Sequence, residues 1–140
     1  MPEELLSYSQ EDLKDLDSLM HELAETSCCE EENLKITIAD PNAHVLVIRD
    51  GGHIVATGTL CVKHTPEFAS AEIESVVVSS QCRGKGYGKQ LLTSLIATAE
   101  KLRVHHIKLT SSPKRVAANK LYQSLGFERY ETNCYMKNIC

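Results

Sequence analysis

A glycine-rich turn between a strand-like and a helix-like segment is the feature that most constrains this chain. The β-branched run Val76 to Val78 ends the strand-like segment, and Gly84, Gly86 and Gly88 follow it closely. Glycine tolerates positive φ and lets a ligand approach the backbone, because it has no Cβ. The first amides of a helix lack intrahelical partners, and the helix dipole favours negative charge beside them. The sequence therefore predicts an anion site here, for which a pyrophosphate is the natural ligand.

Basic side chains strengthen this prediction, while two familiar phosphate motifs do not fit. Arg83, Lys85 and Lys89 place positive charge at the turn. A Walker A motif needs a glycine five residues before its Gly-Lys pair and a Ser or Thr after it, but Arg83 and Gln90 occupy those positions. The dinucleotide fingerprint needs a third glycine at position 89, where this chain has lysine. The turn therefore predicts neither a nucleoside triphosphate loop nor a dinucleotide-binding fold.

A third pattern does fit: Arg or Gln, two residues, Gly, one residue, and Gly or Ala. Two registers satisfy it, Gln81-Gly84-Gly86 and Arg83-Gly86-Gly88, and the sequence leaves both open. This pattern resembles the pyrophosphate loop of the GNAT superfamily of N-acetyltransferases.

A downstream segment strengthens the resemblance. Residues 111–127 resemble the family's second cofactor segment, a helix that carries Asn119 and Tyr122 ahead of a Leu-Gly-Phe ending. The resemblance implies acetyl-CoA as cosubstrate, with the backbone of the valine strand along its pantetheine arm. No metal is expected, because the Cys and His residues lack zinc-site spacing. The cofactor-binding positions so implied are Val76, Val77, Val78, Arg83, Gly84, Lys85, Gly86, Tyr87, Gly88, Lys89, Asn119 and Tyr122.

Acetylation of an amine also requires a group that accepts a proton. An alkylamine with a pKa of about 10.4 is about 0.1% neutral near pH 7.4, a penalty of about 4 kcal/mol. Glu72 and Glu74 alternate with Ile73 and Ser75, so both carboxylates lie on one face of a strand. Glu72 resembles the base position of the family's histone-acetylating branch, and Glu74 resembles that of its hexosamine-phosphate branch. Either carboxylate, or a water chain, could serve as the base.

The resemblance also implies a proton donor for the departing thiolate. Tyr122 lies one helical turn after Asn119 and matches the tyrosine credited with protonating the coenzyme's sulfur in this family. A thiolate whose conjugate acid has a pKa of about 8.5 can leave unaided, so such a donor assists the step. Cys82 beside Arg83 is an alternative nucleophile for a covalent acetyl-enzyme, but no histidine activator accompanies it.

The order of predicted elements favours one mixed α/β domain over residues 1–140. Apolar runs predict strands at 5–8, 44–49, 53–62, 69–78, 106–109 and 130–137. Three- and four-residue apolar spacing predicts helices at 9–23, 91–102 and 116–125, with a short helix near Leu34. The resemblance implies the GNAT fold, a central mixed twisted sheet of about six to seven strands flanked by helices on both faces.

Composition and charge indicate the compartment and the class of partner. A net charge of -4 disfavours a nucleic-acid partner. No apolar run approaches the roughly 20 residues of a membrane-spanning helix, and the acidic start after Met1 is unlike a signal peptide. The six cysteines are scattered without the spacing of a disulfide framework. We therefore expect a cytoplasmic protein that binds neither nucleic acid nor membrane.

Together these features predict an N-acetyltransferase that moves an acetyl group from acetyl-CoA directly to a primary amine. The acceptor is a small molecule or a peptide whose identity the sequence does not specify. The alternative is a CoA-binding sensor or interaction module of the same fold that has no turnover. Dimerisation is common in the family, so a homodimer is a further expectation, without a specified interface.

Overall fold

The computed structural model describes residues 1–140, which divide into two compact units, 1–109 and 110–140. The second unit holds α4 (Val116–Ser124). None of the helices combines the length and apolar character needed to cross a membrane. The first unit contains, in chain order, β1 (Glu3–Glu4), α1 (Gln10–Leu23), α2 (Glu31–Ala39), β2 (Ala43–Asp50), β3 (His53–His64), β4 (Ala69–Val78), a 3-10 turn (Ser80–Cys82), α3 (Tyr87–Lys101) and β5 (Ile107–Lys108).

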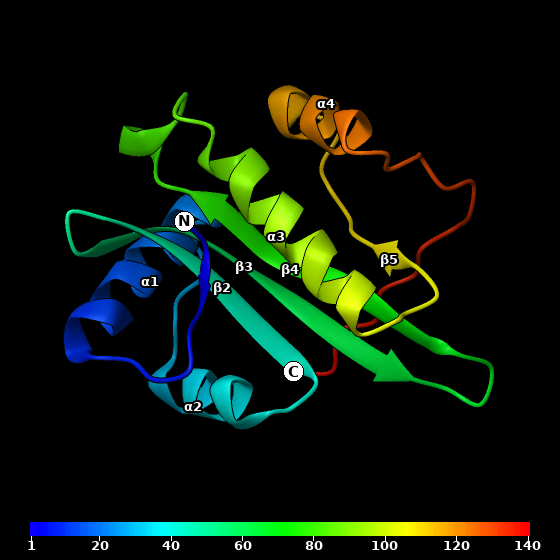
Figure 1. The fold of residues 1–140 in the computed structure, drawn as a ribbon, viewed down its shortest axis with the longest axis horizontal. Helices are drawn as coiled ribbons and strands as arrows, with labels where there is room; N and C mark the ends of the chain where they lie inside the picture. Colours follow the sequence, from blue (N-terminus) through cyan, green and yellow to red (C-terminus); the bar gives the residue numbers. More distant parts are fainter. The chain divides into compact units, whose positions relative to one another are not determined.

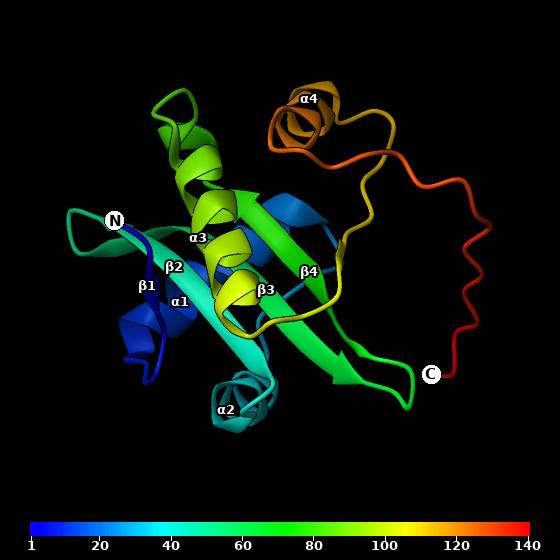
Figure 2. The same ribbon diagram turned by 45° about the vertical axis from the view of Figure 1, so that its right-hand side comes forward.

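The first unit is built on a mixed sheet with the strand order β1-β2-β3-β4-β5. Neighbouring strands from β1 to β4 are antiparallel, and β5 pairs with β4 in parallel. Helix α3 lies on one face of this sheet, and α1 and α2 lie on the other (Figures 1 and 2). The mixed α/β class is confirmed, but the sheet has five strands where six to seven were expected.

The missing strand is the one predicted at 130–137, and that prediction is wrong. The segment carries no regular structure, and Tyr135 and Met136 are 88% and 87% exposed. A strand forms only where another strand accepts and donates its backbone hydrogen bonds, and none pairs with this segment. Alternating apolar residues alone therefore could not identify a strand here.

The sequence also misplaced the first strand, for a different reason. The prediction fell on 5–8, whereas β1 is Glu3–Glu4. Its side chains are held by ion pairs, Glu3 with Arg49 at 2.7 Å and Glu4 with His44 at 2.8 Å. A polar edge strand of this kind has no apolar periodicity to detect.

Other elements formed where the sequence placed them. The β2–β3 hairpin turns through Gly51 and Gly52, whose φ angles of 61° and 83° suit the tight turns that favour glycine. Helix α1 begins with a capping box in which Ser9 and Asp12 each bond the other's backbone amide. Helix α3 begins at Tyr87, ahead of the predicted apolar pattern at 91–102, because polar residues fill its first turn.

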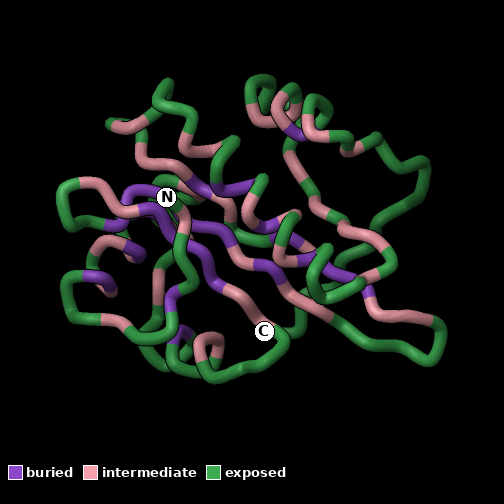
Figure 3. The backbone as a smooth tube through the Cα atoms, viewed as in Figure 1, coloured by how far each residue is buried: buried purple, intermediate pink, exposed green.

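Both faces of the sheet are buried, as Figure 3 shows along the central strands. Val45 and Val47 pack in the core formed with α1 and α2. On the opposite face α3 lies directly against β3, because a Cβ added at Gly58 would come within 3.1 Å of Leu95. This close approach fixes α3 against the sheet, so its N-terminus is anchored just beyond the end of β4.

Candidate functional site

The glycine turn has the backbone that its sequence predicts. Gly84 and Gly86 have φ angles of 86° and 80°, a region that L side chains rarely adopt. A Cβ built on either glycine meets no atom within 4 Å, so the turn faces open space. Gly86 is also the N-cap of α3, and its carbonyl accepts from Gln90 at 3.1 Å. Gly86 belongs to both registers of the sequence pattern, so its conformation is compatible with either one.

The N-terminus of α3 fits a diphosphate group. No side chain caps this helix, and its first turn contains no acidic residue. The amides of Tyr87, Gly88 and Lys89 precede the first intrahelical bond, which Gln90 makes. These amides and the helix dipole favour an anion, and Lys89 and the exposed Arg83 add positive charge.

The structure adds a residue that the sequence did not identify. Asp50, at the end of β2, accepts hydrogen bonds from the Tyr87 hydroxyl at 2.9 Å and from Lys85 Nζ at 3.2 Å. The hydrogen bond from Tyr87 is the first cause of the lowered pKa of Asp50. The carboxylate in turn raises the pKa of Tyr87 and of Lys85. Asp50 lies far from Lys85 and Tyr87 in the sequence, so only the folded structure reveals this contact.

Strand β4 contains a β-bulge. Its pairing with β3 shifts register between Thr57 and Thr59, and Ser75 in the bulge has a φ angle of 55°. A positive φ is costly for a residue other than glycine and is often found at functional sites.

Beyond the bulge, one edge of β4 is free of strands. Strand β5 pairs only with Ala71 and Glu72, so the part of β4 that includes Val76 and Val78 has a neighbour on one side alone. Val77 is buried in the core, while Val76 and Val78 are half-buried. Their backbone groups are therefore placed to pair with an extended ligand.

The two candidate bases form one coupled group. Glu72 accepts from Lys63 Nζ at 2.6 Å, and this bond is the first cause of its lowered pKa. Glu74 is an exposed residue of β4, and the pKa of its carboxyl group is raised, first by partial desolvation and then by a hydrogen bond to Glu72. Two carboxyl groups joined by a hydrogen bond resist double ionisation, so Glu74 is the one more readily protonated.

The remaining predicted residues belong to the second unit. The Asn119 amide donates to the Ser112 carbonyl at 3.0 Å, which ties α4 to the loop before it. The Tyr122 ring meets Phe127 edge to face, with 6.2 Å between the ring centroids. The Phe127 amide bonds the Tyr122 carbonyl at 3.1 Å, just after Gly126, which ends the helix with a φ angle of 95°.

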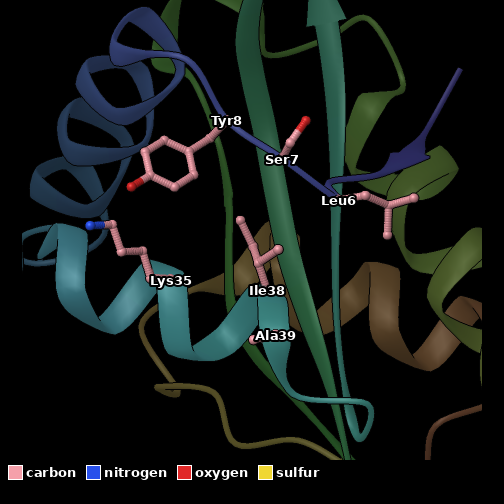
Figure 4. A pocket seen from close by; sticks show the side chains of 6 residues that line it. All are labelled: Leu6, Ser7, Tyr8, Lys35, Ile38 and Ala39. Carbon is pink, nitrogen blue, oxygen red and sulfur yellow. The ribbon is translucent and has the colours of Figure 1, made fainter.

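Two other features involve none of the predicted site residues. A pocket of about 460 Å³ lies between the segment before α1 and helix α2 (Figure 4), lined by Leu6, Ser7, Tyr8, Lys35, Ile38 and Ala39. Glu11, Asp15 and His53 bring possible metal-ligand atoms within 4.8 Å of one another. However, Asp15 already accepts from the Ile54 amide at 3.0 Å and contacts His53 at 3.3 Å, which accounts for that arrangement.

Comparison with known proteins gives a consistent result. The model of the acetyltransferase (GNAT) family matches residues 10–127. A mycothiol acetyltransferase from Pseudarthrobacter chlorophenolicus is 29% identical over 94 residues, or 66% of this chain and 29% of that enzyme. The chain thus matches less than a third of that relative's length.

Solved structures share the whole fold. A protein from Agrobacterium tumefaciens, assigned provisionally as an acetyltransferase, is 25% identical with a TM-score of 0.83, covering 99% of both chains. An aminoglycoside N-acetyltransferase solved in complex with CoA is 14% identical with a TM-score of 0.80, covering 100% of this chain and 95% of that one. At this identity the second likeness concerns the fold alone.

Proposed function

Because the chain belongs to the acetyltransferase (GNAT) family, we propose that it transfers an acetyl group from acetyl-CoA directly to a primary amine. The observation that carries this proposal is the glycine turn that opens into the uncapped N-terminus of α3. Bound acetyl-CoA would supply the activated acetyl thioester that the amine attacks. In this proposal residues 1–140 act as one catalytic domain.

The cofactor residues are assigned by the groups that they offer. The amides of Tyr87, Gly88 and Lys89 would bind the pyrophosphate, with added charge from Arg83 and Lys85. The backbone of Val76 and Val78, beside the free edge of β4, would hold the pantetheine arm as an added strand. Asn119 would contribute from α4.

Glu74 is the proposed general base, and Glu72 is the residue that tunes it. A general base works best when its pKa lies near the operating pH, and the pKa of Glu74 is shifted in that direction. Glu72 is less suited to the role because its carboxylate is bound to Lys63, which lowers its pKa.

Tyr122 is the proposed donor to the departing thiolate, and Tyr122→Phe tests it. We expect kcat to fall by about 100-fold, the low end for general acid catalysis, because a thiolate can also leave unaided. The phenylalanine ring keeps the edge contact with Phe127, so the unfolding midpoint is expected to stay unchanged. An unchanged kcat in a rapid-mixing assay of thiol release would remove Tyr122 from the mechanism.

The acceptor is a small-molecule or peptide amine. One relative is a mycothiol acetyltransferase, which supports a small-molecule acceptor. We propose that the protein needs no metal, acts apart from nucleic acid and membranes, and works in the cytoplasm. A homodimer remains part of the proposal, because dimers are common in this family.

Ligand-dependent thermal unfolding is the experiment that tests the proposed function. At 100 times its dissociation constant, acetyl-CoA is expected to stabilise the fold by about 2.7 kcal/mol and to raise the midpoint by several degrees. ATP with magnesium and NAD serve as controls and are expected to leave the midpoint unchanged. Equal shifts with acetyl-CoA and CoA, without thiol release for any amine in a screen, would favour the non-catalytic CoA-binding module. No shift with either CoA form would refute the proposed cofactor.

A further inference from the structure

Both ends of the glycine turn are held by carboxylates from distant parts of the chain. At its start, the Ser80 amide donates to Glu22 Oε1, near the end of α1, at 2.8 Å. At its end, Tyr87 and Lys85 donate to Asp50 at the end of β2. Neither carboxylate belongs to the sequence pattern that identified the turn.

The turn needs such support because of its composition. Gly84 and Gly86 lose more conformational freedom on ordering than other residues do. A Cβ built on either glycine meets no atom within 4 Å, so no neighbouring group packs against the turn at these positions. Between the Cys82 amide, which bonds Ser79, and the Gln90 amide, which bonds Gly86, no backbone hydrogen bond ties the turn. The contacts with Asp50 therefore fix the segment that presents the α3 amides.

We propose that Asp50 and Glu22 are positioning residues that keep the glycine turn in the conformation that binds the cofactor's pyrophosphate. This inference rests on the proposed function. The hydroxyl of Tyr87, the first residue of α3, fixes the start of the helix, and Lys85 retains further N–H donors for a phosphate. Preorganising the turn lowers the ordering cost that would otherwise reduce affinity.

Asp50 also carries a negative charge close to the proposed anion site. This charge would repel the pyrophosphate, whereas the positioning role of Asp50 would favour its binding. If charge dominated, removing it would strengthen CoA binding. Asn and Ala substitutions separate these effects. In Asp50→Asn a carbonyl oxygen can still accept from Tyr87 without the charge, whereas Asp50→Ala loses both.

The test is the affinity of Asp50→Ala for CoA, measured by calorimetry. We expect the dissociation constant to rise about three- to tenfold, because the variant loses a stabilisation comparable to the net free energy of a single hydrogen bond. Asp50→Asn should bind CoA at least as tightly as the unmodified protein. S-acetylpantetheine, which lacks the pyrophosphate, should show the same KM with all variants.

Glu22→Ala is also expected to weaken CoA binding, and Glu22→Gln is expected to restore it.

A second measurement needs no ligand. Backbone ¹⁵N order parameters of residues 83–89 in the free protein should be lower in Asp50→Ala than in the unmodified protein, with no change in β3. Glu67→Ala, which removes an exposed carboxylate from the β3–β4 turn, controls for net charge.

The outcomes separate this inference from the proposed function. If the unmodified protein binds CoA and Asp50→Ala binds it equally or more tightly, the positioning role is refuted and the cofactor assignment stands. If the unmodified protein does not bind CoA, the proposed function itself fails, whatever the order parameters show.

Discussion

Glu74→Gln is expected to lower kcat by about 10²- to 10⁴-fold, the contribution typical of a positioned general base. Glutamine keeps the size of the side chain and its place on β4 but cannot take a proton from the amine. The KM for acetyl-CoA should change little, because the carboxyl group is not among the proposed cofactor contacts. Steady-state thiol release at saturating acetyl-CoA measures both quantities, and an unchanged kcat would assign proton removal to water.

Glu72→Gln is the matched variant, and it is expected to act through pH. The hydrogen bond and the charge of Glu72 both raise the pKa of Glu74, so their loss should lower it. A base loses activity as pH falls through its pKa, so the acidic limb of kcat should move to lower pH in this variant. The amine's own titration is the same in both proteins and cancels in the comparison. An acidic limb that does not move would show that the two carboxyl groups are not coupled.

Asp12→Ala is expected to lower the free energy of unfolding by about 2–4 kcal/mol. The Asp12 side chain is 9% exposed and accepts from Arg49 Nη1 at 2.8 Å and from the Ser9 amide at 3.1 Å. The variant therefore loses half of the capping box and leaves Arg49 with Glu3 as its remaining partner. Urea unfolding at pH 7 measures the change, and Glu11→Ala, an exposed carboxylate in the same helical turn, is the control.

The effect of Asp12→Ala should depend on pH in a defined direction. The bond with Arg49 is the first cause that holds the pKa of Asp12 below its usual value. A group whose pKa is lower in the folded state stabilises the protein above its unfolded pKa of about 3.9. This contribution is lost as pH falls through the folded pKa. The difference between Asp12→Ala and the unmodified protein should therefore shrink as the pH falls below the unfolded pKa, and a constant difference would contradict the ion-pair argument.

Local signals in the sequence account for most of the elements that formed as predicted. Ser9 and Asp12 identified the start of α1, and the Gly51-Gly52 turn identified the central hairpin. The valine run and the glycines that follow it identified the end of β4, the glycine turn and the start of α3, because strand ending, positive φ and helix start are all encoded within a few residues. The two strand predictions that were wrong, at 5–8 and 130–137, concern segments whose structure depends on pairing partners far along the chain.

The candidate site likewise combines features that local sequence specifies with features that depend on contacts between distant residues. The alternation of Glu72 and Glu74 placed them on one face of β4, since strand periodicity is local. The lowered pKa of Glu72 depends first on Lys63, and Lys63 reaches Glu72 only because β3 and β4 pair in the observed register. The same holds for Asp50, which meets Tyr87 because the hairpin end and the start of α3 lie together.

The sequence by itself determined the glycine turn, the following helix and the family to which they belong, because steric freedom at glycine and unpaired helix amides are properties of a short segment. The tertiary structure alone decided the number of strands, the free edge of β4, the coupling of the two glutamates and the contacts that hold the turn. Those features arise from hydrogen bonds and charges between residues far apart in sequence, and their energies depend on register and burial that no local pattern specifies.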